Sequence, residues 1–186
     1  MTAIDPRTSP LDSLESADDR HLEWAATFFA VAVLLHNGDH LRRGADAISS
    51  DVFWVGSAAI LLEVAVVVAV FLRHPVAPLA AAVTGFNLAI GYVVVHLLPE
   101  RGWLSDPLFE GDASAVSQGA AMLEIAAAVT LGIVGLTVLR HRGGLVSATQ
   151  PSSVPERRLG EVLRHPVVAA MVLGNAVIFA GSLAGL

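Results

Sequence analysis

The sequence predicts an all-α integral membrane protein that folds as a five-helix transmembrane bundle. Of its 186 residues, 54% are hydrophobic and 15% are charged, and a mean hydropathy of +0.65 lies far outside the range of ordinary water-soluble domains. A bilayer core of about 30 Å takes about 20 helical residues to cross. Four apolar stretches meet this length, at residues 52–72, 77–98, 115–139 and 166–186.

The composition also excludes several kinds of function. Cysteine is absent, so disulfides, zinc-thiolate sites, iron-sulfur clusters and thiol nucleophiles are not available to this chain. The net charge of -6 argues against nucleic acid as a partner, because a nucleic-acid-binding protein needs a basic face. Residues 1–20 are polar and acidic, with no basic run before the first apolar stretch, and we expect a flexible cytoplasmic tail there rather than a cleaved signal peptide.

The first predicted span is unusual because its apolar run, residues 24–35, is too short to cross a bilayer. To span, this helix must extend over about residues 22–41, and it then carries the polar sequence HNGDH at residues 36–40 near its end. With this helix included, residues 21–186 are expected to form a single transmembrane domain of five spans.

Five spans distribute the arginines unequally between the two sides of the membrane. Eight of the 11 basic residues fall on the side of the N-terminus, which the positive-inside rule assigns to the cytoplasm. The C-terminus is then external. Trp24, Trp54 and Trp103 fall near predicted span ends, where indole rings bridge lipid and water. Usage rich in alanine and valine and free of lysine indicates a GC-rich bacterial genome, so we expect the membrane to be a bacterial plasma membrane.

Two pairs of spans resemble each other in sequence. Residues 58–65 in the second span and 120–126 in the fourth share one pattern. Each begins with two alanines and ends with Leu-Glu, a β-branched residue and Ala. Arg-His-Pro-Val precedes both the third and the fifth span, at 73–76 and 164–167. We therefore predict one helix plus two repeat-related helical hairpins, with the glutamates of the two pairs facing each other across a pseudo-two-fold axis.

Five ionisable side chains are predicted to lie in the outer half of the bundle. Glu63 and Glu124 lie about 14 to 16 Å from the outer ends of their spans, and His36, His40 and His96 lie closer to those ends. An ionisable group at the bilayer centre costs about 2.5 to 3.5 kcal/mol, so it normally points into the bundle and finds a partner. We therefore expect these side chains to converge.

Imidazole and carboxylate together suit iron, manganese, zinc or copper. We predict that His36, His40, His96, Glu63 and Glu124 bind such a metal ion, with the two glutamates either as ligands or as the catalytic, proton-handling pair. Tyr92, one turn before His96, is the candidate hydrogen-bond donor that supports the cofactor. The motif is weak, because His-x-x-x-His lacks the glutamate of His-Glu-x-x-His and no Glu-x-x-His of di-iron bundles is present.

These residues predict a small membrane metalloenzyme, redox or hydrolytic, that acts on a lipophilic substrate in the lipid bilayer. Three other functions fit the same residues: haem b electron transfer with histidine ligands, proton-coupled transport through the paired glutamates, and a non-catalytic subunit of a larger membrane complex. A Gly-x-x-x-Gly at 181–185 indicates close helix packing, inside the fold or in a homo-oligomer.

Purely structural roles remain open for the same residues. His36, Asp39 and His40 could simply be solvated at a helix end near the lipid headgroups, together with Arg42 and Arg43. The glutamates could be protonated and hydrogen-bonded to each other or to Asn87 and Asn175, which would hold helices together without any chemistry. The acidic residues of the loop after the third span, Asp106, Glu110 and Asp112, are expected to be solvated.

Overall fold

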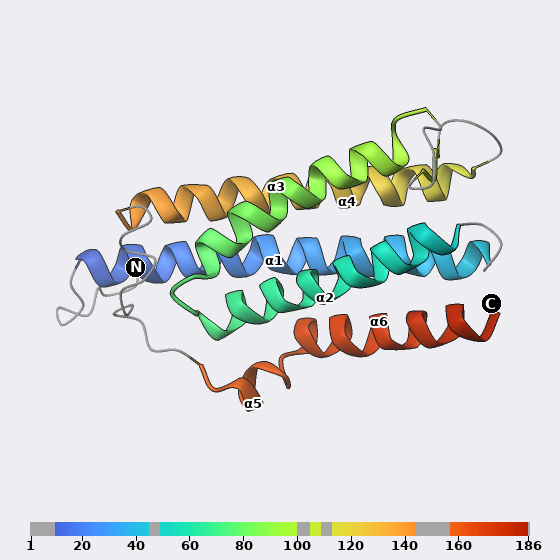
Figure 1. Cartoon of the computed structure of the whole chain (residues 1–186). Coiled ribbons are helices and arrows are strands. Elements are labelled where there is room, and N and C mark those ends of the chain that lie inside the picture. The colour runs from blue at the N-terminus through green and yellow to red at the C-terminus, as the bar shows by residue number, and fades with distance from the viewer. Residues whose placement is uncertain (1–9, 45–48, 100–104, 109–112, 144–156, 186) are drawn as a thin grey trace.

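A computed structural model describes residues 10–44, 49–99, 105–108, 113–143 and 157–185 of the chain, and every element in this part is helical. Five of the helices are long and run side by side (Figure 1). In chain order the helices are α1 (Pro10–Arg43), α2 (Ser50–Leu72), α3 (Ala77–His96), α4 (Ala115–His141), the short α5 (Leu159–Val162) and α6 (Pro166–Gly185).

Four of these helices, α2, α3, α4 and α6, are long and apolar enough to cross a membrane. The protein is therefore a multi-pass helical membrane protein. Their bounds lie within a few residues of the stretches 52–72, 77–98, 115–139 and 166–186, because the apolar stretches are bounded by caps and turns. The hydroxyl groups of Ser49 and Ser114 accept hydrogen bonds at the first turns of α2 and α4. Pro78 stands in the first turn of α3, where its missing N–H costs nothing.

The first helix differs from its prediction in length. Residues 10–20, expected as part of a flexible tail, form the first turns of α1, and residues 1–9 lie outside the described part of the chain. Asp19 accepts a hydrogen bond from Arg142 at 2.6 Å, and Asp18 lies 3.2 Å from His141, so the acidic turns are tied to the end of α4. At 34 residues, α1 is about 51 Å long.

The helix α1 lies in the middle of the bundle and is less apolar than its neighbours. It packs against α2, α4 and α6 and passes through the middle of the bundle (Figure 1). Its buried face consists largely of small and apolar side chains, namely Leu22, Ala25, Ala26, Phe29, Ala30, Ala32 and Val33. The charged and polar side chains that lower the hydropathy of α1 stand toward its two ends, outside the apolar run 24–35. It is not among the four candidate spans.

The helices α3 and α4 approach each other closely through glycine. A Cβ atom on Gly85 would lie 2.5 Å from the backbone nitrogen of Gly132, and one on Gly135 would lie 2.6 Å from the nitrogen of Ala82. Small residues let two helix backbones come together where a larger side chain would hold them apart. This close packing of α3 against α4 therefore occurs inside the fold. Gly181 likewise faces Leu41 of α1.

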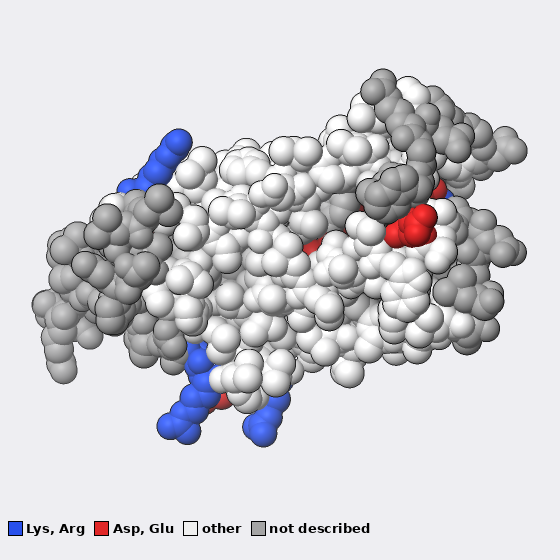
Figure 2. All heavy atoms as spheres, viewed as in Figure 1, with Lys and Arg blue, Asp and Glu red and all other residues white. Residues whose placement is uncertain are grey.

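The surface of the bundle agrees with a membrane environment. Figure 2 shows a face that is almost free of charged side chains between the two ends, with arginines gathered toward one end. Trp24 and Trp54 are 73% and 54% exposed, as expected of interfacial residues, while Trp103 lies outside the described residues. At one end of the bundle, the helices α1 and α3 finish and the helices α2 and α4 begin. We call this the histidine end.

The predicted internal repeat is not confirmed. The Leu-Arg-His sequence at 72–74 ends α2, because Arg73 adopts the left-handed conformation at φ 57°. The same sequence at 139–141 stays helical inside α4. The two hairpins also differ in their connections, since a tight turn joins α2 to α3 whereas α5 and residues outside the described part lie between α4 and α6.

Candidate metal centre

The histidines of α1 lie on the face of that helix that points into the bundle. Phe29, Val33, His36 and His40 follow one another at spacings of four, three and four residues, which places them on one side of an α-helix. Phe29 and Val33 are fully buried in the core, and His36 is 3% exposed. Both histidines therefore extend the buried apolar face of α1 toward the histidine end.

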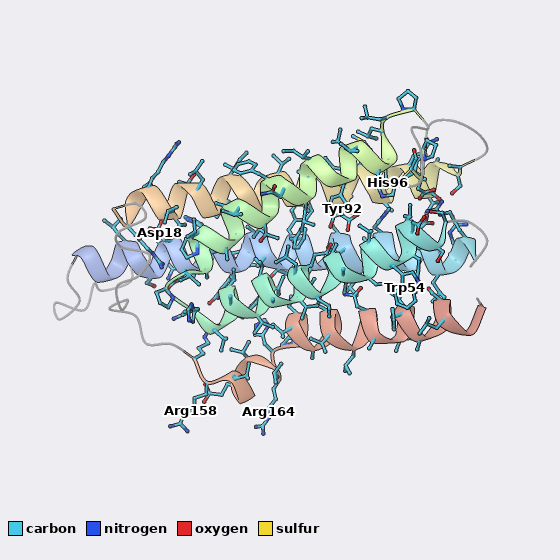
Figure 3. All side chains as sticks on the ribbon, viewed as in Figure 1. Asp18, Trp54, Tyr92, His96, Arg158 and Arg164 are labelled. Atoms are coloured by element: carbon cyan, nitrogen blue, oxygen red, sulfur yellow. The ribbon has the colours of Figure 1, made fainter. Side chains whose placement is uncertain are left out.

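The third histidine reaches the same place from α3. His96 is the last residue of that helix and is 4% exposed. The chain then folds back over this helix end, because Asp106 N–H donates to the carbonyl of Val95 and Leu108 N–H donates to that of His96. Figure 3 shows Tyr92 and His96 one turn apart on α3, both directed toward the interior of the bundle.

The three imidazoles meet at the histidine end. The His36 ring centre lies 4.5 Å from that of His40 and 4.8 Å from that of His96. One ligand atom of each of the three residues lies within 4.8 Å of the others. Convergence of these three side chains is the part of the predicted site that the structure brings together most closely, and it is compatible with a metal ion.

The distance between two of these nitrogens can be compared with the distance expected for two ligands of one metal ion. The Nε2 atoms of His36 and His40 are 2.9 Å apart. Two nitrogens at about 2.0 to 2.1 Å from one ion are about 2.9 Å apart when their bonds meet at a right angle and about 3.4 Å apart in a tetrahedron. The His36–His40 pair matches the right-angled case, whereas ligand atoms as far apart as 4.8 Å would have to approach by about 1.4 to 1.9 Å.

The hydrogen bonds of the cluster fix the tautomers. His96 Nδ1 lies 3.2 Å from the carbonyl oxygen of Asp106, which only accepts, so this nitrogen carries the proton and Nε2 keeps its lone pair. That is the usual arrangement of a metal-binding histidine, whose second nitrogen donates to a carbonyl or carboxylate. His40 Nδ1 accepts from Arg43 at 2.7 Å, so its Nε2–H donates to His36.

In this tautomer His40 cannot bind a cation through Nε2. Its Nε2 atom can bind a cation only after the proton between the two imidazoles has left or moved to Nδ1. In the second case Arg43 must give up its bond to His40. Arg43 has other partners, since it pairs with Asp106 at 2.8 Å and with Asp39 at 3.4 Å.

Two aspartates balance the two arginines beside the cluster. Asp39 pairs with Arg42 at 2.7 Å, and Arg42 also donates to Ser114 and Ser117 at the start of α4. Asp106, expected in solvent, is 9% exposed and bridges Arg43 and His96. The prediction for Asp106 was wrong, because the loop is pinned to the end of α3 by backbone hydrogen bonds. Glu110 and Asp112 lie outside the described residues.

The two glutamates lie beside the imidazoles but outside their tight group. Glu124 Oε2 is 3.5 Å from His36 Nε2, and the side chain is 1% exposed. The Tyr92 hydroxyl donates to Glu63 Oε1 at 2.5 Å and also interacts with Glu124. The buried polar groups thus form a chain that runs from His36 through Glu124 and Tyr92 to Glu63.

All six of the predicted site residues line one cavity of about 250 Å³. The three histidines, the two glutamates and Tyr92 make its polar side. Most of the remaining wall is apolar and comes from α2, α3 and α6, including Val52, Phe53, Ile60, Val95, Ile178 and Phe179. The site therefore combines a polar cluster with an apolar chamber.

The structural alternatives for these residues are weakened by the same contacts. His36 and His96 are buried rather than spread among headgroups. Asn175 accepts a hydrogen bond from Asn37 at 2.9 Å, and the side-chain nitrogen of Asn87 donates to the carbonyl of Val83. Neither amide hydrogen-bonds to a glutamate in the described part of the chain. Instead, the oxygen Oε2 of Glu63 and that of Glu124 are buried without a hydrogen-bond partner.

Sequence reasoning missed Arg43 and Asp106 as parts of this site. Arg43 stands three residues after His40, a spacing at which two side chains on a helix are neighbours, and this signal was available. Nothing local marks Asp106, since its position depends on how the loop folds over α3.

Comparison of the chain with models of known protein families, with curated proteins and with solved structures found no match.

Asp106 provides a first prediction about this site. We expect Asp106→Ala to weaken binding of a divalent metal ion by about 10- to 100-fold, the usual effect of removing a group that orients a ligand. The substitution removes the nearer of the two carboxylate partners of Arg43 and leaves more of its positive charge unbalanced beside the histidines. Titration of the purified protein with Co²⁺ or Zn²⁺ measures the change. Asp51→Ala, which removes an exposed acid from the same end of the bundle, should leave the affinity unchanged.

Proposed function

We propose that this chain is a membrane metalloprotein in which His36, His40 and His96 hold one transition-metal ion, either iron, manganese, zinc or copper. The single observation that carries the proposal is the convergence of three imidazoles, two of them buried and that of His40 half-buried, at one end of the helical bundle. Burying polar groups in such a place is costly unless they share a partner. Imidazole ligands suit all four metals, and the cluster does not choose among them.

The neighbouring acids give the site its chemical possibilities. Glu124, beside His36, is placed to complete the ligand set or to accept a proton from a bound molecule. Glu63 and Tyr92, which share a hydrogen bond, would exchange protons with Glu124. A bound ion would supply Lewis-acid or redox chemistry. In this proposal the protein is a small enzyme that transforms a lipophilic molecule in the cavity.

The proposal includes a placement in the membrane. It takes α1 as a fifth spanning helix, in a bundle whose histidine end lies in the outer half of a plasma membrane and whose N-terminus is cytoplasmic. In support, α1 runs alongside the four apolar helices, and Arg73, Arg140, Arg142, Arg157, Arg158 and Arg164 lie at or near the helix ends opposite the histidines.

The alternatives have less support. Haem b bound between two histidines needs a flat space for the porphyrin between them. The His36 ring would obstruct a porphyrin between His40 and His96, because its centre lies 4.5 and 4.8 Å from theirs while those two centres are only 6.1 Å apart. A proton-coupled carrier needs a polar path across the bundle. On α2, beyond Glu63, the buried residues Val66, Val67, Val70 and Phe71 are all apolar. A non-catalytic subunit would reveal itself by stable co-purification with a partner.

Metal analysis tests the proposal. Protein purified in mild detergent without affinity tags that bind metal should carry about one transition-metal ion per chain. Removing it with a strong chelator should lower the free energy of unfolding by about 3 kcal/mol if the free ion had been present at about 100 times its dissociation constant. Adding the ion back should restore the stability. Purified protein without any stoichiometric metal, whose unfolding is unchanged by each of the four ions, would contradict the proposal.

A further inference from the structure

The cavity beside the histidines has two unlike parts. Its polar side holds the histidine cluster, the two glutamates and Tyr92, and its other walls are mainly aliphatic and aromatic. At about 250 Å³ it is slightly smaller than the sites of drug-sized ligands, which measure about 300 to 1,000 Å³. A lipid with two acyl chains does not fit such a volume. A single apolar chain with a small head group does, especially if the chain extends out of the cavity.

The cavity opens toward the lipid-facing side of the bundle. Gly56 of α2 and Gly91 of α3 line it and are exposed, and a Cβ atom on either glycine would meet nothing within 4 Å. They lie about 9 Å and about 8 Å along their helices from the histidine end. Figure 2 shows an acidic side chain at the bottom of a recess in this apolar face, and the acids that line the cavity are Glu63 and Glu124. The opening is therefore reached from within the bilayer.

The unpaired atoms in the cavity indicate the head group. Oε2 of Glu63 and Oε2 of Glu124 are buried without a hydrogen-bond partner, and the two side chains are 2% and 1% exposed. Unpaired polar atoms in an apolar environment are costly, and a ligand that pairs with them recovers this cost. A hydroxyl group both donates and accepts, so it can pair with a carboxylate or a carboxylic acid. A carboxylate head group would be repelled by an ionised glutamate at the same place.

We propose that this cavity binds a single-chain lipophilic alcohol, which enters from the bilayer between α2 and α3 and places its hydroxyl against Glu63 and Glu124. The inference deepens the proposed function, because it names the substrate class of the same site and rests on that function for its chemical meaning. Binding itself depends on the cavity and its acids, so it is measurable separately from the metal.

Photocrosslinking in phosphatidylcholine nanodiscs tests this proposal. The probe is a decanol that carries a diazirine on its chain, and mass spectrometry maps the labelled peptides. We expect saturable labelling of cavity residues such as Ile60, Val95 and Ile178, displaced by excess 1-decanol and not by decanoic acid. Labelling of lipid-facing residues outside the cavity should not saturate and gives the background.

Two matched variants decide whether the opening is used. Gly91→Leu places a side chain at the opening, where its Cβ atom meets nothing within 4 Å, and saturable labelling should be lost. Gly119→Leu adds the same side chain to an exposed glycine of α4 that also meets nothing within 4 Å and does not line the cavity, so labelling should persist. Gly56→Leu repeats the test from α2. Labelling that survives both substitutions at the opening, or equal displacement by decanoic acid, would overturn the proposal.

Metal content measured on the same samples separates the two proposals. Saturable labelling in protein that binds no metal leaves the alcohol site standing and removes the metalloprotein. Stoichiometric metal without saturable labelling does the reverse. Gly91→Leu and Gly119→Leu should both keep the wild-type metal content, because neither residue contacts the imidazoles.

Discussion

Substitution of His36 by alanine should lower the affinity for the bound metal ion by more than about 100-fold, beyond the usual loss for a group outside the ligand set. His36 is the central member of the cluster, since its ring lies within 5 Å of both other rings, at 4.5 and 4.8 Å. It also contacts Glu124. No other described side chain offers a nitrogen at this position, so the remaining imidazoles would be left as a pair.

Metal titration followed by elemental analysis of the dialysed protein measures this loss. His21→Ala is the matched control, because His21 lies on the same helix but is exposed and far from the cluster. It should bind the ion as the wild type does. His36→Gln keeps a polar side chain of similar length. It provides a second test if His36→Ala does not fold. Wild-type affinity in folded His36→Ala and His36→Gln proteins would show that the cluster is not a metal site.

The second large effect concerns stability. We expect Gly85→Ala to lower the free energy of unfolding by about 3 kcal/mol or more, at the upper end of the usual cost of overpacking. The new Cβ atom would lie 2.5 Å from Gly132 N and 2.6 Å from the carbonyl oxygen of Ala128. Both are backbone atoms, so a side-chain rotation cannot relieve the clash and the two helices must move apart.

Unfolding in mixed detergent micelles with increasing denaturing detergent measures this change. Gly119→Ala provides a control of the opposite sign. Its Cβ atom meets nothing within 4 Å, and replacing a glycine in a helix by alanine usually adds about 0.5 to 1 kcal/mol of stability. If the two variants were equally stable, α3 and α4 would not be held together by backbone contact at Gly85.

Separation of α3 from α4 would also disturb the geometry of the candidate metal centre. Tyr92 and His96 lie on α3, whereas Glu124 lies on α4, one turn before Ala128. The close approach at the glycines therefore sets the distance between the tyrosine and the acid. A partly folded Gly85→Ala protein should lose metal affinity in addition to stability.

Much of the fold could be predicted from local patterns. A run of about 20 apolar residues must be helical in a bilayer, because the lipid offers no partner for the backbone N–H and C=O groups. This argument located α2, α3, α4 and α6. It failed at α1, where hydropathy alone suggested a shorter element than the 34-residue helix, because the polar ends of that helix are paired with other helices.

The sequence by itself determined that three histidines and two glutamates lie toward the same side of the bundle, the histidines near helix ends and the glutamates deeper, since depth along a helix follows directly from residue number. Only the tertiary structure decided that the histidines form the tight group, that the acids lie beside it around Tyr92, and that Asp106 is buried. The physical reason is that depth is a property of one helix, whereas rotation about the helix axis, the approach of two helices and the course of a loop depend on contacts between residues far apart in the chain.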